Sequence, residues 1–115
     1  MHELGIANSV LDAVQTEAAR HPGAVVRKVA VTVGELAGVD PDALAFSFEA
    51  LTTGTEWQHL VLEIQTRPRV QHCCACGLNF RVIDYQFACP ECGASRTECA
   101  GGDELELAYL EMEEP

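Results

Sequence analysis

The sequence lacks long apolar runs and has few basic residues. No stretch approaches the roughly 18 consecutive apolar residues of a membrane-spanning helix. Seven Lys and Arg stand against 18 Asp and Glu among 115 residues, so the formal net charge is −11. Because phosphate backbones are bound through Lys and Arg, this charge argues against nucleic-acid binding. It favours cationic ligands or basic protein partners instead.

Signals for secretion and for common enzyme chemistry are also missing. The chain starts Met1-His2-Glu3, without the basic and apolar regions of a signal peptide, so we expect a cytoplasmic protein. There is no Gly-rich phosphate loop, and no Ser/His/Asp or Cys/His arrangement stands out. We therefore expect a protein that is not an enzyme and leaves any nucleotide hydrolysis to a partner.

Hydrophobic periodicity predicts an α+β fold with two helices and a three-stranded sheet. Apolar residues recur at spacings of three and four over residues 3–20, which indicates an amphipathic helix. A second helix is predicted to start at Asp40-Pro41, because Asp is a good N-cap and Pro suits the first helical position. Strands are predicted over 25–33, 60–66 and 104–112, and a loop over 34–39. In the last predicted strand, Leu105, Leu107 and Tyr109 occupy alternate positions.

The cysteines define a second predicted unit. We expect one α/β domain from residues 1–66 and 103–115, with a cysteine-rich domain of residues 67–102 inserted before the last strand. Two C-x2-C pairs are separated by twelve residues, and a glycine follows each pair. Two residues between thiolates let one tight turn direct both sulfurs at one ion, and glycine permits the positive φ that such a turn needs. This spacing predicts a zinc-ribbon-like, structural Zn²⁺ site with four thiolate ligands: Cys73, Cys76, Cys89 and Cys92.

Other interpretations of these cysteines stay open. Two disulfides would form in an oxidising compartment, and iron would make a rubredoxin-like electron carrier. A zinc-ribbon adaptor without a second metal is a further alternative. Cys74 is expected to point away from the metal, and Cys99 to be a small buried hydrophobic residue. His72 is expected to be a turn residue, with support or exchange of a metal ligand as a further role.

The first residues could chelate a metal. The α-amine of Met1, the next backbone nitrogen and the imidazole of His2 can enclose one ion, with Glu3 adjacent. Such nitrogen and oxygen donors suit Ni²⁺ or Cu²⁺. A histidine and a glutamate near a chain end are nevertheless usually just solvated, so these residues alone make a weak case.

Taken together, the motifs resemble those of the HypA/HybF hydrogenase maturation factors. The matching segments follow the family order over nearly the whole chain. They are Met1-His2-Glu3, Val33-Gly34-Glu35-Leu36, Phe46-Ser47-Phe48-Glu49, Gly54-Thr55, the two C-x-x-C-G pairs and Gly102-Asp103-Glu104-Leu105.

The resemblance implies a nickel metallochaperone that delivers Ni²⁺ for maturation of [NiFe]-hydrogenase. It implies nickel binding by Met1, His2 and Glu3, with His2 as the essential ligand. Asp40 matches an acidic position that can approach nickel, although its N-cap role explains it equally well. The four paired cysteines match the family's zinc ligands. Residues 1–66 and 103–115 would then form the nickel-binding domain, and residues 67–102 the zinc-binding domain.

The resemblance also implies protein partners. These are the maturation GTPase HypB and the large subunit of [NiFe]-hydrogenase, and some family members also serve urease. Cys74, Cys99 and Gly5 depart from the minimal family pattern. Because glycine inside a helix costs about 1 kcal/mol relative to alanine, Gly5 could mark the true start of the first helix, leaving the preceding residues free.

Overall fold

Two α-helices and two three-stranded sheets make up the protein, which confirms the predicted α+β class. The structure is a computed structural model and describes residues 3–114. The elements in chain order are α1 (Glu3–Arg20), β1 (Val25–Gly34), the 3-10 turn η1 (Glu35–Ala37), α2 (Pro41–Thr52), β2 (Val61–Arg67), β3 (Val70–Cys73), β4 (Asn79–Arg81), β5 (Thr97–Gly101) and β6 (Leu105–Glu113).

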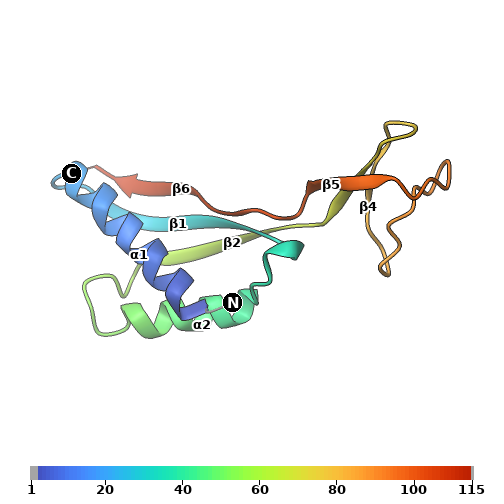
Figure 1. Cartoon of the computed structure of the whole chain (residues 1–115). Helices are drawn as coiled ribbons and strands as arrows, with labels where there is room; N and C mark the ends of the chain where they lie inside the picture. Colours follow the sequence, from blue (N-terminus) through green and yellow to red (C-terminus); the bar gives the residue numbers. More distant parts are fainter. Residues whose placement is uncertain (1–2, 115) are drawn as a thin grey trace.

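The first sheet has the strand order β2-β1-β6, and both helices lie on one of its faces (Figure 1). β1 runs parallel to β2 and antiparallel to β6. The main core lies between this face and the helices, since apolar side chains of the central strand meet the apolar stripes of α1 and α2. Its most deeply buried members include Val14, Val29 and Leu44.

A β-bulge interrupts the regular alternation of side chains along β6. Leu107 pairs with Val31, but the next registered pair is Tyr109 with Ala30, so Ala108 is an extra residue. Paired residues share a face, so Tyr109 lies on the face opposite Leu105 and Leu107 rather than beside them. On that face the Tyr109 hydroxyl donates a 2.8 Å hydrogen bond to Glu63, and this bond is the largest cause of the lowered pKa of the Glu63 carboxyl.

The second sheet has the order β4-β3-β5 and lies at one end of an elongated molecule (Figure 1). The principal extents are 56 × 26 × 15 Å. No strands were predicted in this segment. These strands are short, of three to five residues, which leaves little length in which a periodic pattern can appear.

The two sheets meet where Gly34 crosses Gly102. Gly34 N–H donates to Glu104 C=O at 2.7 Å, and Leu36 N–H donates to Gly102 C=O at 2.6 Å. The Glu35 carboxylate accepts a 3.0 Å hydrogen bond from Arg69 N–H, which ties η1 to the segment that enters β3. Side chain and backbone therefore fix the second sheet against the first.

Several predicted boundaries need correction. α1 begins at Glu3 and includes Gly5, so Gly5 does not mark the start of this helix. Residues 35–37, predicted as loop, form η1. The second strand covers Val61–Arg67, and the last covers Leu105–Glu113. Within residues 3–114, no helix combines the length and the apolar character needed to cross a membrane.

Candidate metal centre

The first cysteine pair lies on a tight turn between β3 and β4. Cys73 N–H donates to Leu78 C=O at 2.9 Å, and Gly77 N–H donates to Cys73 C=O at 3.0 Å. Gly77 has φ of 82°, as its position after the pair predicted. In addition, Cys76 N–H donates to the Cys73 sulfur at 3.4 Å. The turn therefore directs Cys73 and Cys76 to the same side.

The second pair repeats this arrangement. Cys89 N–H donates to Ala94 C=O at 3.0 Å, and Gly93 N–H donates to Cys89 C=O at 2.9 Å. Gly93 has φ of 74°. Because both turns have the same hydrogen bonds and the same left-handed glycine, they present two matching pairs of sulfur atoms.

The four predicted ligands come together in one cluster. All four Sγ atoms lie within 4.8 Å of one another. The Cys73–Cys92 and Cys76–Cys89 sulfur pairs are each 3.6 Å apart. A tetrahedron with Zn–S bonds of about 2.3 Å has S···S edges of about 3.8 Å. A disulfide requires about 2.05 Å, and these cysteines are free. The donor set therefore fits one tetrahedral, thiophilic ion such as Zn²⁺.

The four thiols differ in acidity. The backbone N–H of Cys76 is the main cause that lowers the pKa of Cys73, to about 6. The backbone N–H of Cys92 likewise lowers the pKa of Cys89. At Cys76 the backbone N–H of Leu78 acts in the lowering direction, but the neighbouring sulfurs and burial outweigh it and raise the pKa to about 12. Cys73 is consequently a thiolate at neutral pH, the form that binds a divalent cation.

A chain of polar contacts that begins at the buried Gln71 was not predicted from the sequence. Gln71 is buried on β3, and its side-chain amide donates to the Thr97 hydroxyl at 3.0 Å. Thr97 in turn donates to Phe87 C=O at 2.7 Å, just before the second cysteine pair. This chain connects β3 and β5 to the segment that carries Cys89. The available signal was spacing: Gln71 lies two residues before Cys73, so in a strand the two side chains share a face.

The three residues beside the cluster behave differently from one another. Cys74 is exposed, as expected for a side chain that points away from the metal. Cys99 is also exposed, so the prediction of a buried residue was wrong, because β5 lies at an edge of the small sheet. His72 lies in β3 rather than in a turn, and its Nδ1 is 2.7 Å from the Asn79 amide oxygen on β4.

The structure describes two of the four predicted nickel ligands, Glu3 and Asp40. Met1 and His2 lie outside the described residues. Glu3 is the first residue of α1 and is half-buried. Asp40 caps α2, and its Oδ1 accepts hydrogen bonds from Asp42 N–H at 2.9 Å and Ala43 N–H at 3.3 Å. Since both bonds use Oδ1, a cation would have to approach Oδ2.

Known proteins match this chain over nearly its full length. The profile of a family described as "Hydrogenase/urease nickel incorporation, metallochaperone, hypA" matches residues 1–112. Hydrogenase maturation factor HypA of Alkalilimnicola ehrlichii is 38% identical over 113 residues, which cover 98% of this chain and 100% of the relative. The protein of that name from Acidithiobacillus ferrooxidans is 35% identical with the same coverage.

Solved structures share the fold. The solution structure of the Ni metallochaperone HypA from Helicobacter pylori has a TM-score of 0.65, 23% identity and full coverage of both chains. A solution structure titled HypA protein has a TM-score of 0.70, also at 23% identity, and covers 97% of this chain and 96% of that one. The comparisons as a whole do not favour the zinc-ribbon adaptor or the rubredoxin-like carrier.

Proposed function

Because the chain belongs to the HypA family of nickel-incorporation metallochaperones, we propose that it binds Ni²⁺ through its first residues and passes the ion on for maturation of a [NiFe]-hydrogenase. The observation that carries this proposal is the family match over residues 1–112, which includes Met1-His2-Glu3. The donors are the Met1 amine, the His2 imidazole and the Glu3 carboxylate, with Asp40 as a further carboxylate ligand.

The positions of the two carboxylates suit an ion that must be released. Glu3 is in the first turn of α1, and Asp40 is the N-cap of α2. A helix N-terminus carries about half a positive charge, which stabilises a carboxylate but repels a cation bound to it. The net charge of −11 attracts Ni²⁺ over a longer range. Together these effects favour fast capture with moderate affinity.

We assign the four-cysteine cluster a structural role, with Zn²⁺ as its resident ion. Cys73, Cys76, Cys89 and Cys92 would fill a tetrahedral coordination shell and leave no position for a substrate. A bound Zn²⁺ would cross-link the two turns. This would stabilise a segment that has short strands and few buried apolar residues. Residues 67–102 would then be the zinc-binding domain, and residues 1–66 with 103–115 the nickel-binding domain.

The family role also identifies the setting and the partners. Thiolate ligands persist in a reducing compartment, which agrees with action in the cytoplasm. The maturation GTPase HypB would provide nucleotide hydrolysis, since this chain has no phosphate-binding loop motif. The large subunit of [NiFe]-hydrogenase would receive the nickel, and urease accessory proteins are further partners of the same kind.

A nickel titration of the zinc-loaded chain with its native N-terminus tests the proposal. His2→Ala should weaken Ni²⁺ binding by at least about tenfold, because it removes one of few strong donors. His21→Ala is the matched control: His21 is an exposed histidine just after α1 and should not affect affinity. Equal Ni²⁺ affinities for His2→Ala and the unaltered chain would refute the site.

A further inference from the structure

The last strand of the first sheet has an unoccupied hydrogen-bonding edge. β6 follows β1 in the order β2-β1-β6, and within residues 3–114 no strand pairs along its outer side. It is nine residues long. Unpaired N–H and C=O groups on an edge of this length are a template for another extended chain, unless the protein covers or blunts them.

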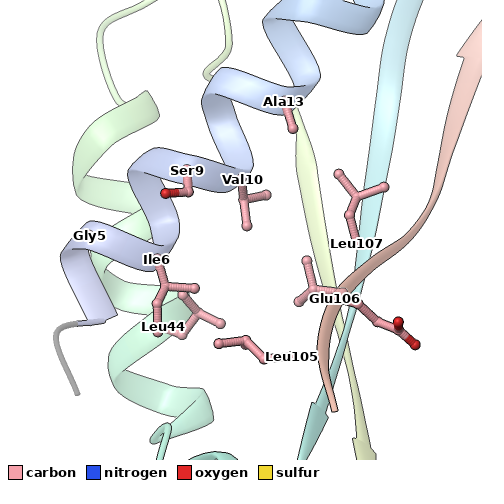
Figure 2. Close-up of a pocket in the computed structure, with 10 residues that line it drawn as sticks. Gly5, Ile6, Ser9, Val10, Ala13, Leu44, Leu105, Glu106 and Leu107 are labelled. Atoms are coloured by element: carbon pink, nitrogen blue, oxygen red, sulfur yellow. The ribbon is translucent and has the colours of Figure 1, made fainter.

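An apolar groove runs beside this edge, between α1 and β6 (Figure 2). Its volume is about 450 Å³. On β6, Leu105 and Leu107 face α1 and are 40% and 39% exposed. On α1 the groove is lined by small or aliphatic residues: Gly5, Ile6, Ser9, Val10 and Ala13. Leucine side chains on the helix-covered face of a sheet are normally buried, so this part of the face lacks a partner.

Charge defines what can pair with the edge. Glu106 points away from α1 in Figure 2, and the register places Glu106 and Glu111 opposite Thr32 and Lys28, on the face away from the helices. In the described part of the chain, neither glutamate belongs to a salt bridge. A second copy of β6 would bring two glutamate-bearing faces side by side, and like charges across strands are destabilising.

We propose that β6 is a docking edge for an extended segment of a partner protein in which apolar and basic residues alternate. The segment adds to the sheet as a fourth strand through main-chain hydrogen bonds. Because side chains of a strand point alternately to its two faces, the apolar residues fill the groove beside Leu105 and Leu107. The basic residues then lie beside Glu106 and Glu111. None of the groove-lining residues is a proposed nickel ligand, so docking is assayed without nickel.

The probe is a synthetic peptide of the length of β6 that alternates valine and lysine, with blocked ends. A permuted peptide of the same composition, with the valines and lysines in two blocks, controls for charge. At physiological salt, the alternating peptide should bind the zinc-loaded full chain at least about tenfold more tightly than the permuted one. It should also slow hydrogen exchange of backbone amides in Leu105–Glu113.

Variants test whether the peptide binds in the groove or is held only by non-specific electrostatic attraction. Leu105→Ser with Leu107→Ser should reduce binding of the alternating peptide to the level of the permuted one. Val61→Ser changes an even more exposed apolar residue, on the opposite edge strand, and should leave binding unchanged. Glu106→Gln should weaken binding and reduce its salt dependence. Equal affinity for both peptides would overturn the proposal, and so would β6 amides protected by self-association in the absence of peptide.

Discussion

Replacement of Gly34 by alanine tests how closely the two sheets are joined. Gly34 has φ −83° and ψ 155°, an ordinary extended conformation that alanine also adopts. A Cβ at this position would nevertheless lie 2.1 Å from Gly102 O and 2.8 Å from Asp103 N. The expected effect is therefore purely steric, and it falls on backbone atoms that cannot rotate away.

The magnitude follows from what must move. Gly102 is itself closely packed, because a Cβ built on it would lie 2.5 Å from the Cα of Arg69. Separation of the chains lengthens the Gly34–Glu104 and Leu36–Gly102 hydrogen bonds, each worth about 1 kcal/mol. Overpacking adds about 1–3 kcal/mol. We expect Gly34→Ala to lower the free energy of unfolding by about 3–5 kcal/mol.

Urea unfolding of the zinc-loaded chain measures this loss. Gly5→Ala is the matched control, because a Cβ on Gly5 meets no atom within 4 Å and Gly5 lies inside α1. That substitution should raise the free energy of unfolding by up to about 1 kcal/mol. The same chemical change thus has opposite signs at two sites. A loss smaller than about 1 kcal/mol for Gly34→Ala would refute the argument from close approach.

Three further predictions concern the metal sites. Cys89→Ser should lower the bound zinc per chain and increase hydrogen exchange across β3–β5; an unchanged zinc content would contradict the ligand set. Zinc binding should release more protons below about pH 6 than above it, because Cys73 then also starts protonated. An indicator dye counts the released protons, and a number that does not change across this pH range would contradict the lowered pKa of Cys73. Asp40→Ala should cost about 1 kcal/mol of stability in thermal unfolding, whereas Asp40→Asn should keep the cap and weaken Ni²⁺ binding, and unchanged nickel affinity in Asp40→Asn would remove Asp40 from the site.

Local patterns in the sequence predicted the first sheet and its helices well. The α1 stripe and the Asp40-Pro41 start both depend on neighbouring residues, and the structure has them where the pattern placed them. The alternation did not reveal that Tyr109 lies on the face opposite Leu107, because the bulge at Ala108 depends on the partner strand rather than on the local sequence.

The cysteine cluster was predictable in its members but not in its surroundings. Spacing and glycines identified the two turns, and the structure brings their four sulfurs together. Exposure of Cys99 and the buried position of Gln71 depend on how β3, β4 and β5 are ordered, which no short-range pattern specifies. The proposed nickel ligands Met1 and His2 lie outside the described residues, so their arrangement stays a prediction.

The strand order of the first sheet has a consequence for protein engineering. β2 ends at Arg67, which is registered with Gly34, and β6 begins at Leu105, which is registered with the adjacent Val33. Neighbouring strands are about 4.8 Å apart, so these two ends lie about 10 Å from each other across β1. A splice of three or four residues, at up to about 3.3 Å each, could bridge that gap. The cysteine-bearing segment is thus an insertion whose two ends lie close together. Its deletion would give a shorter chain that retains both helices and all three strands of the first sheet.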